Sequence, residues 1–510
     1  MRTIQLDTLL NTLFLFLCFS LLTSSLQAQL IKNVIIVDGT GAKGYKGAVR
    51  IKGDKIQAMG NLTALPGEVV LDGKGKVLAP GFIDSHSHHF SSLLAQPEGI
   101  PNASQGVTSI VIGQDGESYL MDTLESMVRE KPLAINVATY TGHSTLRELT
   151  MGEKEVYRKA TTAEIEKMKS ILENDLKKGS LGLSSGLEYE QAFFSDKQEV
   201  IDLAKVAAEN HTRYMSHIRS EDITIDDAME EIIEIGRVTK MPVQVSHIKI
   251  GIKDKWETAN NFLSKLQKAR AEGIDITADV YPYNFWNSTL RVLFPKRDYT
   301  NIKSAQFAVD QVLDVNESVL VQYAPNPNYK GKTIGVIAKE RNETPAVTLM
   351  QLIQIAADFK ASHPEYKGTV EAIAAKGMHE ADVANFIKWP YSNICSDGNT
   401  GGHPRGYGSF PRILGKYVRE EKVIDLETAI FKMTGLTAEH LGIKDRGLIA
   451  PGYFADLVLL DPETVKDNAT IQNSKALSTG ITAVWVNGQL IYQNQKATGN
   501  YPGSLIKHSF

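Results

Sequence analysis

The chain has 510 residues, so two or three domains are expected rather than one. It is 42% hydrophobic and 22% charged, with a formal net charge of −4, which is typical of a globular protein with a sizeable core. The absence of a basic stripe argues against a nucleic-acid partner.

The first 28 residues have the pattern of a secretory signal. Arg2 precedes an almost wholly apolar run from Leu9 to Leu22, and small and polar residues then lead to Ala28. An apolar run of this length is short for a membrane span and suits a signal peptide. We therefore predict cleavage after Ala28, export to the periplasm or the medium, and no stable membrane span in the mature chain. The alternative is an uncleaved N-terminal membrane anchor.

The two ends of the chain share a texture of short alternating strands broken by glycine. Residues 29–76 contain runs such as Val34–Asp38, and residues 441–510 contain runs such as Ile481–Val486. Turn signals recur about every ten residues, which is a small-sheet pattern. Because each run is too short to bury a face alone, the two ends are predicted to pair into one small β-sandwich domain. After cleavage the chain keeps only Cys395, so no internal disulfide is expected.

Residues 77–440 alternate between strands and helices. Helix-like stretches such as 225–239 and 260–272 separate several of the strands. Repetition of this unit predicts an α/β fold, a (β/α)8 TIM-like barrel. The predicted strands are 77–86, 107–114, 133–141, 181–186, 213–217, 241–247, 275–283 and 392–397. The interval of about 285–390, between strands seven and eight, is too long for one loop and helix and is interpreted as an inserted lid.

Histidine and aspartate gather where these strands end, which is where barrel enzymes place their chemistry. His86 and His88 lie two residues apart after the first strand, so both imidazoles can point to one side. His217 and His247 end two adjacent strands, about 4.8 Å apart, and can reach one ion. Asp397 ends the eighth strand, which neighbours the first in a closed barrel.

Neutral imidazole and carboxylate together suit Zn²⁺ or another divalent metal. A bound metal lowers the pKa of water to about 7, so that hydroxide is available at neutral pH. Asp397 is placed to take a proton and deliver it to a leaving nitrogen. The sequence thus predicts a metal-dependent hydrolase.

Several motifs of the chain resemble those of a known enzyme superfamily. The run Pro80-Gly-Phe-Ile-Asp-Ser-His-Ser-His88 is similar to the first-strand signature of the amidohydrolase superfamily. Further motifs resemble its D-aminoacylase, or N-acyl-D-amino-acid deacylase, branch, and the likeness spans about residues 30–495. These motifs are Gly142–Arg147, Gly182–Tyr189, Ser216–Glu221, Ser246–Lys249, Tyr281–Tyr283, Ser396–Gly398 and His403–Arg405.

The resemblance implies a role for each matching residue. His217 and His247 match the tight metal ligands, and His86, His88 and Asp397 match a second, weaker site, with Asp397 also the general base. One or two zinc ions are implied. The implied substrate contacts are Lys249, Arg405, Tyr189, Tyr281 and, more loosely, Ser288. Arginine and lysine suit a substrate with a free α-carboxylate.

One departure from the family stands out at the end of strand two. The family usually has a cysteine there in an Asn-Cys-Gly run, whereas this chain has Gln114-Asp115-Gly116. Asp115 is predicted to replace the thiolate as a ligand and to bridge two ions; the alternative is a turn aspartate. A harder oxygen ligand leaves the identity and number of the metals open.

The predicted activity is hydrolysis of N-acyl-D-amino acids, with a small-molecule substrate as the only partner expected. The alternatives are a cyclic-amide hydrolase of hydantoinase or dihydroorotase type, an isoaspartyl dipeptidase, and a non-catalytic binding protein on a barrel scaffold. Cyclic-amide relatives commonly carry a carboxylated lysine at the end of strand four, but this strand ends Leu183-Ser-Ser-Gly-Leu187. The sequence does not predict an oligomeric state.

Overall fold

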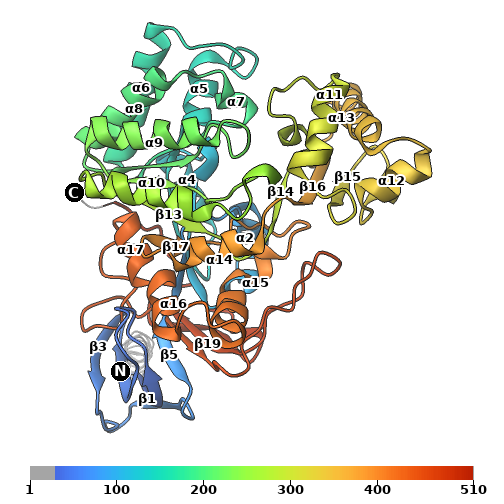
Figure 1. Ribbon diagram of the computed structural model, residues 1–510. Helices are drawn as coiled ribbons and strands as arrows, with labels where there is room; N and C mark the ends of the chain where they lie inside the picture. The colour runs from blue at the N-terminus through green and yellow to red at the C-terminus, as the bar shows by residue number, and fades with distance from the viewer. Residues whose placement is uncertain (1–28, 509–510) are drawn as a thin grey trace, which may run out of the picture.

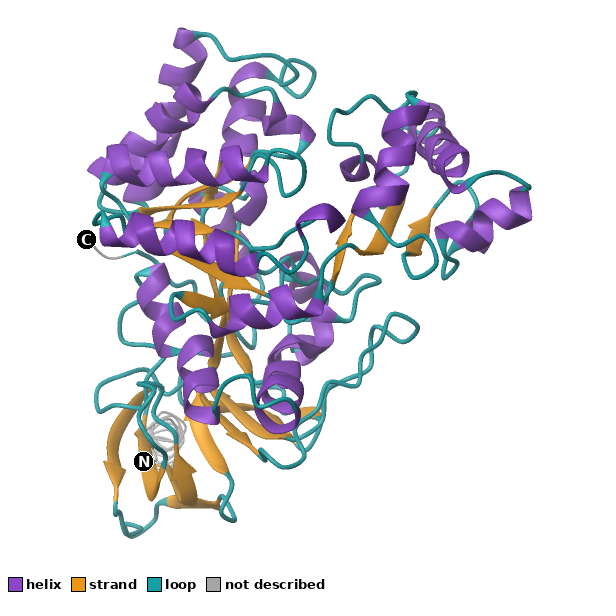
Figure 2. Ribbon diagram, viewed as in Figure 1, coloured by secondary structure: helices purple, strands orange, loops and turns teal. Residues whose placement is uncertain are grey.

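The structure, a computed structural model, describes residues 29–508, so the predicted signal peptide lies outside the described residues. A helix-wrapped barrel occupies the centre, a β domain lies at one end, and a lid projects from the side (Figure 1). The strands of the barrel are enclosed by helices, whereas those of the β domain gather at the bottom of the view (Figure 2).

The barrel contains the predicted strand–helix repeat. Two parallel sheets make its wall, and a parallel bridge between Ser87 and Gly398 joins the first strand to the last. Gly186 of the fourth strand pairs with His217 of the fifth, which aligns the carboxyl ends of the strands. The strands are β6 Phe82–Asp84, β7 Val107–Ile112, β8 Asn136–Thr139 with β9 Thr141–Gly142, β10 Gly182–Gly186, β11 Arg213–His217, β12 Val243–Val245, β13 Ile276–Val280 and β17 Ser392–Ile394.

The helices cover the outside of the barrel. The longest one beside it, α6 Thr162–Lys177, begins at a capping box in which Thr161 and Glu164 satisfy each other's backbone N–H groups. Helix α9 Ile225–Thr239 has the predicted bounds and buries an apolar stripe that includes Met229 and Ile232. The others are α2 Phe90–Ala95, α3 Ile100–Ala103, α4 Met121–Glu130, α5 His143–Met151, α7 Glu190–Phe193, α8 Lys197–Glu209, α10 Ala259–Ala271, α14 Glu380–Lys388, α15 Arg405–Arg412, α16 Leu426–Met433 and α17 Gly435–Leu441.

The first predicted strand, 77–86, is divided at Gly81. Its first half, β5 Val77–Pro80, belongs to the β domain, and only β6 belongs to the barrel. A Cβ at Gly81 would lie 2.2 Å from Cγ2 of Thr108, so only glycine fits where the chain crosses from one domain to the other. The boundary therefore lies at residue 81 rather than at 76.

The chain ends pair into one nine-stranded sheet. Its order is β21-β20-β19-β18-β5-β1-β2-β3, with β4 beside β1. Strand β5 joins the two ends, since it pairs in parallel with β1 and antiparallel with β18. The strands are β1 Gln29–Ile36, β2 Tyr45–Lys52, β3 Lys55–Gly60, β4 Val69–Asp72, β18 Leu457–Leu460, β19 Ile481–Val486, β20 Gln489–Gln493 and β21 Lys496–Ala497.

The C-terminal tail departs from the predicted domain division. Ile506 donates its N–H to the carbonyl of Val137, and Gly503 donates to Leu133, so the tail runs along the barrel. The segment after β21 thus belongs to the barrel surface rather than to the β domain. Among residues 29–508, no helix has the length and apolar character that crossing a bilayer requires.

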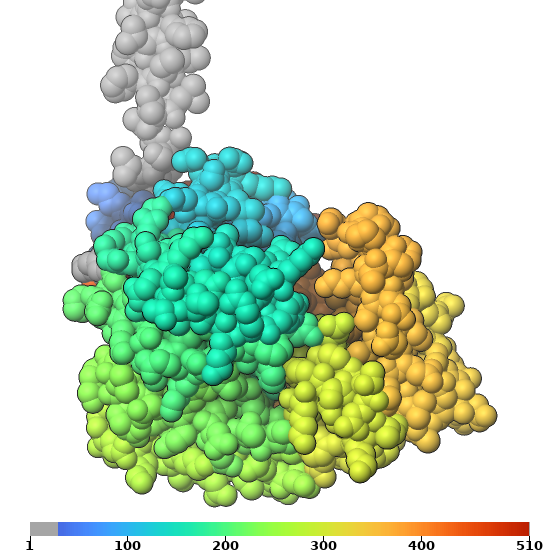
Figure 3. Space-filling view, turned by 90° about the horizontal axis from the view of Figure 1, so that it is seen from above, coloured from blue at the N-terminus to red at the C-terminus, as the bar shows by residue number. Residues whose placement is uncertain are grey.

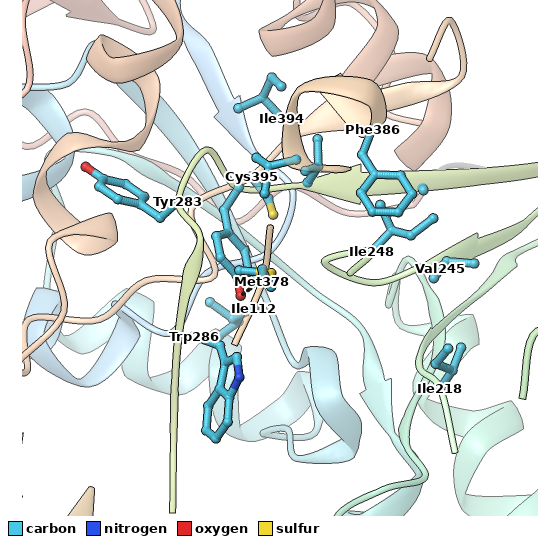
Figure 4. Close-up of a cluster of buried hydrophobic side chains, with 14 of the residues drawn as sticks. Ile112, Ile218, Val245, Ile248, Tyr283, Trp286, Met378, Phe386, Ile394 and Cys395 are labelled. Atoms are coloured by element: carbon cyan, nitrogen blue, oxygen red, sulfur yellow. Dashed lines mark hydrogen bonds between the residues drawn. The ribbon is translucent and has the colours of Figure 1, made fainter. Parts of the chain in front are cut away.

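The lid is shorter than predicted. It is a three-stranded antiparallel sheet, ordered β14-β16-β15, covered by helices, and it ends near Lys376 because α14 already packs against the barrel helix α10. Its elements are β14 Phe285–Ser288, α11 Ile302–Phe307, β15 Val319–Tyr323, α12 Ile334–Arg341, α13 Pro345–Ser362 and β16 Glu371–Lys376. Trp286 and Met378 at its base lie in the same buried apolar cluster as Ile112 and Cys395 of the barrel (Figure 4).

Candidate metal centre and active-site cleft

Six predicted ligands converge at the carboxyl end of the barrel. His217 is the last residue of β11, and the others follow directly after β6, β7, β12 and β17. Five of them have at most 11% of their side chain exposed to solvent, and His88 has 37%, because the strand ends lie below the surface. The set is His86, His88, Asp115, His217, His247 and Asp397.

The first histidine pair faces two carboxylates. Nε2 of His86 lies 3.3 Å from Oδ2 of Asp115 and 3.6 Å from Oδ1 of Asp397. Nε2 of His88 lies 3.4 Å from the same Asp115 oxygen and 3.2 Å from the same Asp397 oxygen. These four ligand atoms lie within 4.8 Å of one another, which is the spacing of one metal site.

The second histidine pair faces the other oxygen of Asp115. Oδ1 of Asp115 lies 3.3 Å from Nε2 of His247 and 4.0 Å from Nδ1 of His217. The two ring nitrogens are themselves 2.9 Å apart. Asp115 thus directs one oxygen to each pair, which is the arrangement expected of a carboxylate between two ions.

Three of the six residues have left-handed backbone conformations. The φ angles are 60° at Asp115, 36° at His247 and 47° at Asp397. Such angles cost about 1–3 kcal/mol each outside glycine and persist where the surroundings impose them. The N–H of His247 donates to buried Asp279 over 2.5 Å, and the N–H of Asp397 donates to the carbonyl of His86 over 2.8 Å.

The charges of the cluster favour a cation. Burial alone would lower the pKa of His88, but hydrogen bonds to Asp115 and Asp397 raise that pKa to about 10. Burial and Lys249 would lower the pKa of His247, but Glu221 and Asp115 raise it to about 10. Burial would raise the pKa of Asp115, yet the imidazoles of His86 and His247 hold it well below its ordinary value. The site attracts protons strongly, and metal ions compete for the same lone pairs.

Unpaired polar atoms also point to a metal. Oδ1 of Asp115 is buried and has no hydrogen-bond partner among the described residues. Imidazole and carboxylate ligands in this number suit zinc, and the residues present therefore fit the predicted cofactor.

A cavity of about 910 Å³ opens above the ligands, between the barrel and the lid. The space-filling view shows a hollow between the teal part of the barrel and the yellow and orange lid (Figure 3). Four of the five predicted substrate contacts line it: Tyr189, Lys249, Ser288 and Arg405. Ser288 ends the lid strand β14, so the lid contributes to the site.

The two cations in the cavity are held by carboxylates. Nζ of Lys249 donates to Oε1 of Glu221 over 2.6 Å, and Nη1 of Arg405 donates to Oδ2 of Asp397 over 2.5 Å. The fifth predicted substrate contact, Tyr281, is buried and is not among the residues that line the cavity. Its ring packs 4.7 Å from the Arg405 guanidinium, and its hydroxyl faces Met378.

Two carboxylates of the site were missed in the sequence. Glu188 follows β10 and lies 2.9 Å from Nε2 of His217, and Glu221 lies 3.1 Å from Nδ1 of His247. Both lie a few residues beyond a strand end, so the same rule that identified the histidines would have included them.

Comparison with known proteins identifies relatives along almost the whole chain. Residues 69–319 and 308–492 match the amidohydrolase family. The D-aminoacylase of Alcaligenes xylosoxydans xylosoxydans is 31% identical over 505 residues, covering 94% of this chain and 97% of that protein.

Solved structures agree with the sequence relatives. The N-acyl-D-glutamate deacylase of Bordetella bronchiseptica, complexed with zinc and a phosphonate mimic of the tetrahedral intermediate, is 29% identical. It superposes with a TM-score of 0.83 over 95% of this chain and 100% of that one. A D-hydantoinase is only 16% identical, with a TM-score of 0.59 over 95% of this chain and 99% of that one, and shares the fold alone.

Proposed function

The chain belongs to the amidohydrolase family and, within it, to the N-acyl-D-amino-acid deacylases, and we propose that it uses the strand-end cluster to hydrolyse N-acyl-D-amino acids. The reaction releases a carboxylate and a D-amino acid. The observation that carries this proposal is the position of Lys249 and Arg405, which line the same cavity as the metal-ligating side chains.

The ligand atoms of the six predicted residues fall into two groups that share Asp115. His86, His88 and Asp397 would hold one zinc ion, and His217 and His247 would hold the other. When bound, zinc polarises the amide carbonyl and lowers the pKa of water to about 7. Asp115 would bridge the two positions, as its two oxygens face opposite histidine pairs.

The chain's own residues supply proton transfer and orientation. Asp397 accepts a proton from the attacking water and passes it to the leaving nitrogen. Lys249 and Arg405 hold the α-carboxylate of the substrate, the latter by the guanidinium donors that Asp397 does not occupy. Burial of the cluster and the lid above it keep bulk water from the reacting atoms.

A substrate panel tests the proposal. The metal-loaded mature protein is assayed on N-acetyl-D-amino acids, their L-enantiomers and a hydantoin. Hydrolysis of the D-series, lost on chelation and restored by zinc, is the expected result. Turnover of the hydantoin in place of the linear amides would contradict it.

We further propose that the mature protein is exported. The support is the apolar run from Leu9 to Leu22 followed by small and polar residues to Ala28. N-terminal sequencing of the protein from its native host should begin at Gln29; an intact N-terminus in a membrane fraction would favour the anchor instead.

A further inference from the structure

Both ring nitrogens of His217 have polar partners. Its Nδ1 faces His247 and Asp115, and its Nε2 lies 2.9 Å from Oε2 of Glu188. Glu188 is 4% exposed and His217 is 3% exposed, so this hydrogen bond is largely shielded from solvent. An N–H fixed on Nε2 leaves the lone pair on Nδ1, the nitrogen that faces the ligand cluster.

The segment that carries Glu188 is also bound to the lid. Arg297 of the lid donates to the backbone carbonyl of Glu188. Two residues on, the Glu190 carboxylate accepts hydrogen bonds from Arg291 Nη1 and from the Tyr299 hydroxyl, each over 3.0 Å. Residues 188–190 therefore lie between the lid and the ligand cluster.

Arg297 is anchored firmly on the lid side of this contact. Its Nη1 group donates to three lid carbonyls, those of Arg291, Val292 and Phe294. Its Nη2 group reaches across to the carbonyl of Glu188, so a shift of the lid base changes the position of the Glu188 backbone. Tyr189 adds a second path, because its ring lies 4.4 Å from the ring of His217.

We propose that Glu188 is a positioning residue for His217, and that residues 188–190 couple the lid to the metal centre. The inference rests on the proposed role of His217 as a metal ligand. Because coupling between two sites is reciprocal, loosening the lid base must weaken metal binding, and metal binding must steady the lid.

Zinc affinity, measured by chelator competition on the full mature chain, tests the role of Glu188. Glu188→Ala should raise the zinc dissociation constant about 10–100-fold, as loss of a ligand's hydrogen-bond partner typically does. Glu188→Gln should rescue part of this loss, because its amide oxygen still accepts the Nε2 hydrogen. Should Glu188→Ala not fold, Glu188→Gln carries the test alone, and an unchanged dissociation constant in it would overturn the proposal.

A matched pair of residues elsewhere in the barrel provides the control. His143 and Glu199 make the same kind of contact over 2.8 Å at 1% and 2% exposure, and neither belongs to the ligand cluster, although Glu199 also pairs with Arg147. Glu199→Gln should leave zinc affinity unchanged. An equal loss in Glu199→Gln and Glu188→Gln would show a general effect on the fold and would overturn the specific role.

The lid contact is tested through Arg291. Its ion pair with Glu190 is 34% and 32% exposed, so Arg291→Met should raise the zinc dissociation constant about two- to fivefold. Lys332→Met is the control, since it breaks a lid ion pair of similar exposure, 34% and 44%, that makes no contact with residues 188–190. Identical zinc affinity in Arg291→Met and wild type would overturn the coupling.

Hydrogen exchange supplies a readout independent of turnover. Zinc should slow amide exchange in residues 289–300 of the wild type and should slow it less in Glu188→Ala. His217→Ala separates the two proposals: if it keeps full zinc affinity, the proposed metal site is wrong. If it loses zinc while Glu188 and Arg291 variants do not, only the present inference is wrong.

Discussion

Arg405 donates a hydrogen bond from Nη1 to Oδ2 of Asp397 over 2.5 Å, and both side chains are buried. The other oxygen, Oδ1, faces His88 at 3.2 Å. Burial would raise the pKa of Asp397, but the Arg405 guanidinium outweighs burial and holds that pKa below its ordinary value. Asp397 is therefore ionised at neutral pH, with one oxygen fixed and the other directed toward the ligand cluster.

Asp397→Asn should retain the fold and the metal but lose most turnover. Asparagine keeps the shape and can still accept from Arg405, yet it cannot take up a proton. General acid–base catalysis contributes about 10²–10⁴-fold, so kcat should fall at least that far. The measurements are kcat and zinc content on one preparation. Activity within about tenfold of wild type would mean that another group moves the proton.

Arg405→Lys should impair both substrate binding and the chemical step. Lysine keeps a positive charge but lacks the planar pair of donors that holds a carboxylate and Asp397 together. We expect a higher KM and a lower kcat on N-acetyl-D-amino acids, by about tenfold or more in kcat/KM, the effect of losing about 1.4 kcal/mol. On an N-acetyl-D-amino acid amide, which lacks the α-carboxylate, the rise in KM should disappear while the fall in kcat stays. An equal rise in KM on both substrates would show that Arg405 does not recognise the α-carboxylate.

Protonation of the buried Glu371 carboxyl should make the stability of the lid depend on pH. Burial raises the pKa of this carboxyl to about 7, against the N–H of Leu290, which donates to it over 2.7 Å. The folded lid thus holds a proton that the unfolded chain releases, so lid stability should fall as pH rises from about 4.5 to 7 and then level off. Glu371→Gln keeps an acceptor for Leu290 and removes the charge. It should stabilise the lid by about 1–3 kcal/mol at pH 8 and change little at pH 4.5, with one pKa unit corresponding to about 1.4 kcal/mol.

Hydrogen exchange of the β16 amides at the two pH values measures that effect locally. Glu365→Gln is the control, because Glu365 is an exposed lid carboxylate, and it should change stability by less than about 0.5 kcal/mol. A pH-independent difference between Glu371→Gln and wild type would show that charge on Glu371 is not the cause.

The sequence predicted the fold and the ligand cluster for one physical reason. In a parallel barrel the strand ends meet at one rim, so His86, His217 and Asp397 could be brought together without knowing any contact. Domain limits were harder, because the division of strand 77–86 at Gly81 depends on the tertiary contact with Thr108. The packing of the Tyr281 ring against the Arg405 guanidinium also depends on a tertiary contact.

The strand-end rule reaches Glu188 and Glu221 as residues of the rim, but it does not predict their roles. Glu188 and Glu221 are identified by the ring nitrogens they face, and a strand-end rule does not say which way a side chain turns. The lid limits depended on recognising α14 as a barrel helix, which its packing against α10 establishes.

Asp115, where the chain departs from its family, gives the last prediction. Its oxygens face two histidine pairs at 3.3 Å each, to His86 and to His247, so removal of the carboxylate should disturb both positions. Asp115→Ala should lower zinc content and kcat together. Asp115→Cys should stay active and retain at least one tight zinc, because thiolate binds zinc well.

The left-handed backbone at Asp115 calls for a matched control. Asp445 has a φ of 57°, close to the 60° of Asp115, and is exposed at the surface away from the ligand cluster. Asp445→Ala therefore measures the cost of placing alanine in that conformation without any loss of a ligand. It should reduce stability slightly and leave zinc content and kcat unchanged. If Asp115→Ala behaves like Asp445→Ala in zinc content and rate, then Asp115 is a turn residue and the four histidines and Asp397 hold the metal without it.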